Sequence, residues 1–320
     1  MSPAAPAMPP QLRLRSMTWA ADGVLLLEWV HLAGAALPAF EAGAHINLQL
    51  PNGLSRSYSL CNAPGETHRY CVAVGRDRNS RGGSRLVHEQ LRPGELWPVS
   101  APANHFRLDE SAPAFALMAG GIGVTPVLAM ARRLAALGKP VQMFYAVRSR
   151  DAAAFADELA ALVPALTLHC DDEAGGPPDL AAWLGRLPKT TGAYCCGPAP
   201  MLDGFVAACG ALGLADVHIE RFAAAPSTAE ALAGCTVTLQ RSGRDIAVPA
   251  ATSILDALLA AGIDHPFSCR EGVCGTCESR VISGDIDHRD GVLSPAEQAR
   301  GDVLMICVSG CKGPRLVLDL

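Results

Sequence analysis

The sequence has little charge and few aromatic residues, and its charge balance narrows the kinds of partner that the protein can bind. Charged residues make up 18% and aromatic residues 5% of the 320 positions, and the formal net charge is −5. A chain without an excess of Lys and Arg lacks the electrostatic footprint for nucleic acid or an anionic membrane surface. Small molecules and other proteins are therefore the expected partners.

Two further absences concern export and membranes. Residues 1–10 show no charged start followed by an apolar run, so we expect no secretory signal and a cytoplasmic location. The longest uncharged stretch, residues 114–131, is interrupted by glycines and by Pro126. This favours a strand, a turn and a helix over a membrane span.

The hydrophobic pattern changes along the chain, and at 320 residues we expect two or three domains. Residues 12–108 hold short runs of alternating polarity between turn signals, which predicts an antiparallel barrel. Further along, apolar runs at 114–119, 141–147, 166–169, 192–196 and 217–220 alternate with helical segments. That alternation is typical of a doubly wound parallel sheet. The small, uncharged stretch around 223–231 indicates a linker into a last compact unit.

Four cysteines in this last unit have a spacing that is typical of cofactor ligands. Cys269, Cys274 and Cys277 form a C-x4-C-x2-C motif, and Cys307 follows downstream. This is the spacing of plant-type [2Fe-2S] ferredoxins, in which four thiolates hold two irons. Glycines at 272 and 275 leave the loop free to wrap closely around such a cluster. Without an export signal, cofactor ligation is favoured over disulfides.

Two alternatives to this cluster stay open on the residues alone. Structural zinc usually shows paired C-x2-4-C knuckles, and only one such pair is present. Cys311 is a conceivable fourth ligand, but the spacing favours Cys307. The other cysteines are expected to pack as small hydrophobic residues: Cys61, Cys71, Cys170, Cys195, Cys209 and Cys235.

Two motifs in the predicted parallel sheet favour a dinucleotide. Gly120-Gly121-Ile122-Gly123-Val124-Thr125-Pro126 leads from a strand into a helix expected over 127–137, where backbone amides can hold a pyrophosphate. Alone it indicates no more than a tight turn. It gains weight from Cys196-Gly197-Pro198 at the end of a later strand, because ligands gather beyond the carboxyl ends of such strands.

A flavin-like pattern lies in the barrel. Arg56-Ser57-Tyr58-Ser59-Leu60 places a cation and a planar ring on one face of a strand, suited to a phosphate and to an isoalloxazine ring. Arg81-Gly82-Gly83-Ser84 is a second phosphate-binding candidate at the start of a helical stretch over 85–91. Taken separately, each is equally consistent with an ordinary strand or turn.

Together these motifs resemble those of the phthalate dioxygenase reductase and vanillate demethylase reductase family, in the family's order and over essentially the full chain. The resemblance implies an FMN-binding antiparallel β-barrel over residues 1–108 and an NAD-binding doubly wound α/β domain over 109–225. It implies a plant-type [2Fe-2S] ferredoxin domain, with the α+β β-grasp fold, over 226–320.

The resemblance also implies which residues touch each cofactor. Those expected at the flavin are Arg56, Tyr58, Ser59, Ala73, Val74, Gly75, Gly82, Gly83, Ser84, Thr125 and Phe222. Those expected at the dinucleotide are Gly120, Gly121, Gly123, Gly197, Pro198 and Met201, with Cys196 beside the nicotinamide to assist hydride transfer by positioning.

The implied function is electron transfer in a multicomponent system. Hydride passes from NAD(P)H to FMN, and single electrons then pass through the cluster to a separate Rieske-type oxygenase or demethylase. A redox-sensing protein would not need the flavin and dinucleotide motifs. An FAD reductase serving a methane or toluene hydroxylase usually carries its ferredoxin domain at the N-terminus, unlike this chain.

The choice between NADH and NADPH is nearly balanced in the sequence. Arg148 and Arg150 follow the second strand of the sheet domain, near where a ribose would lie, and could accept a 2′-phosphate. They could equally be solvated or contact the pyrophosphate. The family resemblance favours NADH.

Overall fold

The computed structural model describes residues 9–77, 80, 82–223 and 232–320. The chain divides into two compact units, Met1–Glu220 and Arg221–Leu320. Arg81 and most of the expected linker lie outside the described residues. The finer boundaries at 108 and 225 stay predictions. Among the described residues, no helix is long and apolar enough to cross a membrane.

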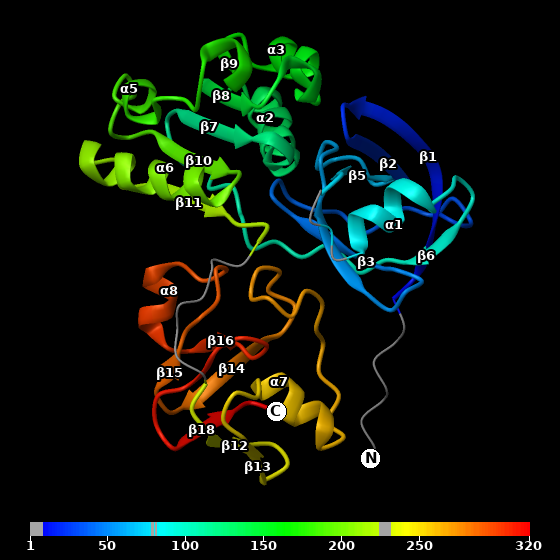
Figure 1. Ribbon diagram of the computed structural model, residues 1–320, viewed down its shortest axis with the longest axis vertical. Coiled ribbons are helices and arrows are strands. Elements are labelled where there is room, and N and C mark those ends of the chain that lie inside the picture. The colour runs from blue at the N-terminus through cyan, green and yellow to red at the C-terminus, as the bar shows by residue number, and fades with distance from the viewer. Residues whose placement is uncertain (1–8, 78–79, 81, 224–231) are drawn as a thin grey trace. The chain divides into compact units, whose positions relative to one another are not determined.

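The first half of unit 1 is a ring of antiparallel strands (Figure 1). One sheet has the order β5-β2-β1-β6, formed by Tyr70–Gly75, Val24–His31, Gln11–Ala21 and Leu96–Pro98. A second sheet pairs β3 (His45–Gln49) with β4 (Ser55–Ser59). Bridges between Leu48 and Val99 and between Leu60 and Val72 join the two sheets at both edges. The predicted barrel is confirmed, with α1 (Gly83–Glu89) following β5.

The second half of unit 1 is the predicted parallel sheet. Its strand order is β11-β10-β7-β8-β9, formed by Val217–Glu220, Gly192–Cys196, Phe115–Gly120, Val141–Val147 and Leu166–Cys170. The order reverses between β7 and β10, so the loops after these two strands border the crevice where such sheets bind ligands.

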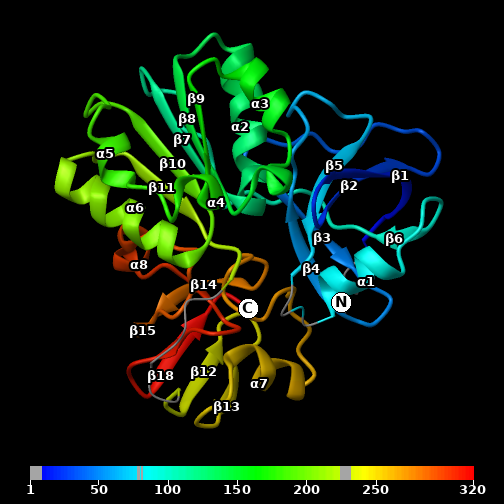
Figure 2. The ribbon, with the colours of Figure 1, turned by 45° about the horizontal axis from the view of Figure 1, so that its top comes forward.

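Alternation along β7 explains why helices cover both faces of this sheet. Leu117 and Ala119 pack in one core with α2 (Val124–Ala136) and α3 (Ala156–Leu162), whereas Ala116 and Met118 pack in another with α5 (Leu180–Leu184) and α6 (Ala199–Leu212). Figure 2 shows the two pairs of helices on opposite sides of the sheet. A strand buried on both faces must be apolar throughout, as residues 115–120 are.

Unit 2 is a mixed sheet with one crossing helix. Its strand order is β13-β12-β18-β14-β16, formed by Arg244–Val248, Cys235–Leu239, Arg315–Leu318, Glu278–Ser283 and Val303–Met305. Only the β12–β18 pair is parallel, and α7 (Ile254–Ala260) packs against β13. A short pair, β15 (Ile286–Asp287) and β17 (Gly310–Cys311), and α8 (Pro295–Arg300) complete the unit. The expected α+β class is confirmed.

Candidate functional site

The flavin motifs of the barrel meet where β4 passes the start of α1. A Cβ placed on Gly83 would lie 2.8 Å from Nε and 2.9 Å from Cγ of Arg56, so only glycine leaves room for the arginine stem. Gly82 has φ 98°, a backbone conformation that favours glycine. The hydroxyl of Ser84 lies 3.3 Å from the backbone nitrogen of Asp77 and accepts its hydrogen bond. A guanidinium beside a helix start suits a phosphate group.

The strand that continues this site ends beside the glycine-rich turn of the parallel sheet. The predicted segment 73–75 forms the end of β5. The carbonyl of Val74 lies 2.9 Å from Nε2 of His88 on α1, which ties the strand to that helix. A Cβ on Gly75 would lie 3.4 Å from the side chain of Ile122. On β4, burial raises the pKa of Tyr58 to about 12, so its phenol stays neutral.

The two dinucleotide motifs also come together. A Cβ on Gly120 would lie 2.6 Å from both Sδ of Met201 and Cδ of Pro198, and one on Gly123 would overlap the carbonyl of Cys196. The turns after β7 and β10 therefore pack backbone against backbone at the reversal of strand order. A side chain at either glycine would push the two turns apart and occupy the space that a pyrophosphate needs.

Thr125 and Gly121 shape the same turn. Gly121 has φ 52°, in the left-handed region. The Thr125 hydroxyl donates to the carbonyl of Ile122 at 3.1 Å and the residue is buried, so it braces the turn from within. The expected contact of Thr125 with the flavin stays a prediction.

The barrel and the parallel sheet meet at a residue that the motifs did not single out. The carboxyl group of Glu220, the last residue of β11, lies 3.5 Å from the hydroxyl of Ser59 and 3.9 Å from the thiol of Cys196. Burial raises the pKa of Glu220 to about 8, and burial likewise raises that of the fully buried Cys196. The sequence did hold a signal for Glu220, because it ends a predicted strand at the same sheet edge.

Glu220→Gln should remove a pH dependence of stability. Because the pKa of Glu220 rises from 4.5 to about 8 on folding, the folded protein keeps a proton that the unfolded chain releases. Relative to the glutamine variant, the parent should lose stability as pH rises from about 5 to about 8, and no more above that. Thermal unfolding followed by flavin fluorescence measures this. A constant difference between the two midpoints would contradict it.

The two arginines after β8 differ in their partners. Arg150 donates two hydrogen bonds to Glu173, at 2.9 and 2.8 Å from Nε and Nη2, in a bidentate ion pair. The backbone carbonyl of Arg148 accepts from the amide of Asp172 at 3.1 Å. Acidic residues thus crowd the place where the sequence suggested phosphate recognition, while the expected contacts of both arginines with a dinucleotide stay predictions.

In unit 2, the four cysteines of the predicted cluster converge. Cys269 is hydrogen-bonded through its thiol to both Cys274 and Cys307, and Cys307 is hydrogen-bonded in turn to Cys277. The amide of Glu271 donates to Sγ of Cys269 at 3.3 Å, as amides do around a charged cluster. Hydrogen bonding to Cys269 and burial raise the pKa of Cys274. Iron binding must therefore displace that proton. The four thiols fit a [2Fe-2S] cluster.

Cys311, the alternative ligand, is engaged elsewhere. Its thiol donates to the carbonyl of Gly313 at 2.8 Å and is hydrogen-bonded to Cys235. This pairing favours Cys307 over Cys311 as the fourth ligand.

A charged segment that sequence reasoning missed braces the cluster loop. The side chain of Asp290 is fully buried and accepts from the amide of Leu293 at 2.8 Å and from the hydroxyl of Ser309 at 3.2 Å. The amide of Gly291 donates to the carbonyl of Gly272 at 2.9 Å. This segment therefore joins the cysteine loop to the chain that follows Cys307. The run Asp287-His288-Arg289-Asp290 was its only sequence signal.

Phe222 belongs to unit 2 and is 42% exposed. Its expected place over the flavin stays a prediction.

Comparison with known proteins identifies relatives of this chain. A family model for the 2Fe-2S iron-sulfur cluster binding domain matches residues 237–312, which include all four cysteines. The chain is 49% identical over 322 residues to the phenoxybenzoate dioxygenase subunit beta of Ectopseudomonas oleovorans, covering 100% of both chains.

Two solved structures extend the likeness to the fold. Phthalate dioxygenase reductase, whose structure is described as modular for electron transfer from pyridine nucleotides to [2Fe-2S], is 39% identical, with a TM-score of 0.71 and 97% of each chain covered. An intact type IV self-sufficient cytochrome P450 monooxygenase is 38% identical, with a TM-score of 0.90. The match covers 97% of this chain, which spans 41% of that longer one.

The barrel, the doubly wound sheet and the four-cysteine loop together define an oxidoreductase of the electron-transfer reductase class. The chain belongs to the phthalate dioxygenase reductase family.

Proposed function

We propose that this protein is the reductase component of a Rieske-type oxygenase or demethylase system. It takes hydride from a nicotinamide cofactor onto FMN and passes single electrons through a [2Fe-2S] cluster to a terminal oxygenase. One observation carries the proposal: a single chain brings Ser59 and Cys196 together at Glu220, where the barrel meets the parallel sheet, and also holds a set of four converging thiols. Family membership supports the same partner class.

The residues divide the task between binding and positioning. Arg56 and the 82–84 turn hold the flavin phosphate, and the glycine turns after β7 and β10 hold the pyrophosphate. Cys196 and Ser59 set the approach of the two rings, and Glu220, neutral below about pH 8, adds no negative charge beside them. A bound flavin supplies the change from two-electron to one-electron chemistry. No side chain is needed as an acid or base.

Cofactor content and acceptor stoichiometry test the proposal together. Flavin released by heat should run as FMN on chromatography, and iron analysis should give two irons per chain. Oxidation of each NADH should reduce two molecules of ferric cytochrome c. Recovery of FAD at one per chain would overturn the flavin assignment. Absence of NADH-dependent cytochrome c reduction by the fully loaded protein would overturn the function.

We also propose the cytoplasm as the compartment, because none of the twelve cysteines, all of which are described, forms a disulfide.

We propose NADH as the working donor, because Glu173 already occupies Arg150 and adds negative charge where a 2′-phosphate would lie. Glu173→Gln should raise kcat/KM for NADPH and leave that for NADH within about twofold. A charge-assisted phosphate contact is worth roughly 1.5–3 kcal/mol, but the pair is exposed and screened, so we expect a gain of only about three- to tenfold.

The double variant Glu173→Gln/Arg150→Ala is the control, because it should lose the gain in NADPH efficiency. If the parent instead prefers NADPH and Arg150→Ala abolishes that preference, the donor assignment is wrong.

A further inference from the structure

The hydride site is built from two halves, and its geometry depends on how they are fixed together. Ser59 comes from the barrel, whereas Cys196 and the glycine turn come from the parallel sheet. Hydride transfer requires the reacting atoms to approach within about 3–3.5 Å, and a misplacement of about 1 Å can cost roughly 100-fold in rate. A contact that fixes the position of one half relative to the other should therefore affect the rate of hydride transfer.

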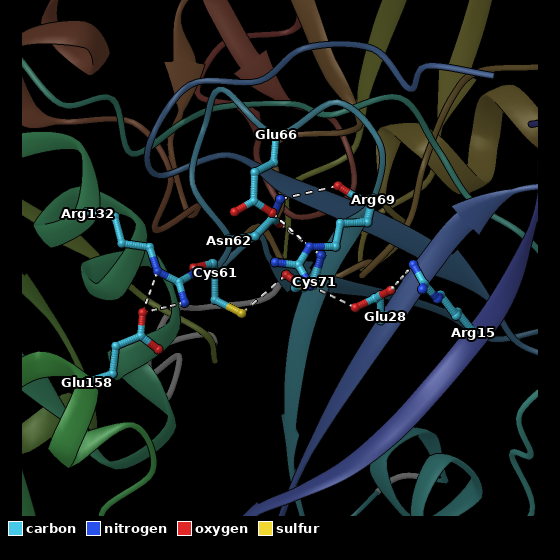
Figure 3. Close-up of polar contacts among 9 residues, drawn as sticks. All are labelled: Arg15, Glu28, Cys61, Asn62, Glu66, Arg69, Cys71, Arg132 and Glu158. Carbon is cyan, nitrogen blue, oxygen red and sulfur yellow. Dashed lines mark hydrogen bonds and ion pairs between the residues drawn. The ribbon is translucent and has the colours of Figure 1, made fainter. Parts of the chain in front are cut away.

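Arg132 makes such a contact. It lies on α2, the helix that begins in the glycine turn, and Nη1 donates to the backbone carbonyl of Cys61 in the barrel. Its Nε and Nη2 both lie close to Oε1 of Glu158 on α3, at 2.8 and 2.6 Å. Figure 3 shows the guanidinium between Glu158 and Cys61. One planar fork thus spans the two halves of unit 1.

The barrel end of this contact is firmly held. Cys61 lies two residues beyond Ser59, and both its amide and its thiol donate to the carbonyl of Cys71, at 2.9 and 3.3 Å. Asn62 accepts from the amide of Cys71 at 2.9 Å and donates to the carbonyl of Arg69 at 3.2 Å. The Cys61 carbonyl therefore sits on a braced segment that continues directly from the flavin strand.

The network extends away from this segment into the barrel. Arg69 pairs with Glu66 at 2.8 Å and with Glu28 at 2.9 Å, and Glu28 pairs with Arg15 at 3.1 Å (Figure 3). The helix end is equally constrained, because α2 is buried along residues 124–131 and places Arg132 about 10 Å along the helix from Thr125. Both the Cys61 segment and α2 are therefore held in place where Arg132 joins them.

We propose that Arg132 is a positioning residue for hydride transfer, which fixes the glycine turn of the nicotinamide half against the flavin strand by holding α2 to the Cys61 carbonyl. This inference rests on the proposed function. The side chain touches no reacting group, so its effect should appear in the rate of flavin reduction rather than in the affinity for either cofactor.

Its neighbour Arg133 provides a matched control. Arg133 stands next to it on the same helix and forms a bidentate ion pair with Glu110, at 2.6 and 2.9 Å. Glu110 lies in the segment that enters the parallel sheet, so this pair leaves the barrel untouched. Arg133→Leu removes the same charge and an equivalent ion pair without releasing the Cys61 carbonyl.

The test is anaerobic rapid mixing of FMN-loaded full-length variants with NADH, followed by flavin absorbance. For Arg132→Leu, the limiting rate constant should fall at least about tenfold while the apparent Kd for NADH changes less than about threefold. The long-wavelength charge-transfer absorbance of the NADH–flavin complex should weaken. Arg132→Lys should recover part of the rate, because an ammonium can still donate to the carbonyl but lacks the fork. Arg133→Leu should stay within about twofold of the parent.

Two outcomes overturn the proposal: a parent-like rate in Arg132→Leu, or an equal loss in Arg133→Leu. Should Arg132→Leu fail to fold, Glu158→Gln takes its place, because it keeps the charge of Arg132 and weakens its orientation. A smaller loss in rate with unchanged Kd is then expected, and a parent-like rate there overturns the proposal. If NADH fails to reduce the flavin of the parent itself, the proposed function has failed rather than the role of Arg132 within it.

Discussion

Cys274→Ser should abolish cluster assembly and stop electron delivery while leaving flavin reduction intact. Cys274 is buried and hydrogen-bonded to Cys269, and serine cannot replace its thiolate as an iron ligand. NADH-driven cytochrome c reduction should fall at least about 100-fold, because loss of a ligand exceeds the roughly 10- to 100-fold cost of losing a group that only orients one. Flavin reduction should persist, because the barrel and the parallel sheet, which carry all the proposed flavin and dinucleotide residues except Phe222, lie in unit 1. Iron content and both rates measure the effect.

Cys311→Ser is the matched control for this substitution. Its thiol donates to Gly313 outside the converging set, so iron content and visible spectrum should match those of the parent. Loss of the cluster in Cys311→Ser, together with normal loading in Cys307→Ser, would reassign the fourth ligand.

Cys196→Ala should slow flavin reduction by NADH about 10- to 100-fold without loosening the flavin. The thiol is fully buried at the end of β10, beside Glu220, where the barrel and the parallel sheet meet and where we propose that hydride is transferred. Removing it leaves space in which the nicotinamide can settle away from its productive position. Rapid-mixing kinetics and flavin content measure the two effects separately.

Cys195→Ala controls for the loss of a buried thiol. Cys195 is equally buried but packs in the core on the α5–α6 face of the sheet. Its variant should lose stability and keep the rate of flavin reduction. Equal slowing in both variants, or none in Cys196→Ala, would reassign Cys196 to packing.

Much of the fold could be predicted because its strands carry strong local signals. The apolar runs at 141–147, 192–196 and 217–220 coincide with β8, β10 and β11. Helix bounds were less secure: α2 begins at Val124 rather than at the predicted 127, because Thr125 and Pro126 fit a first helical turn as well as a loop. The barrel's closure depends on bridges between residues far apart in sequence, which no local pattern specifies.

The sequence offers candidates for the site where close packing demands glycine and where cysteine spacing suits a cluster. Gly120 and Gly83 are required by contacts that a Cβ would block, and the cysteine spacing follows from the size of the cluster. The sequence analysis did not single out Glu220 or Asp290, because acidic side chains are ordinarily solvated. Only their burial in the folded protein gives these two residues their roles. Arg132 was missed as well, because its partner in the barrel is a backbone carbonyl, which has no signature in the sequence.

In this protein, one chain carries electrons from a nicotinamide to an iron–sulfur cluster by way of a flavin. Anaerobic mixing of the purified protein with NADH tests it most directly, with the flavin and cluster absorptions followed together and the reduced cluster detected by electron paramagnetic resonance. We expect the flavin absorption to bleach first and reduction of the cluster to follow at no faster a rate. A cluster that dithionite reduces but that stays oxidised after NADH has bleached the flavin would contradict it.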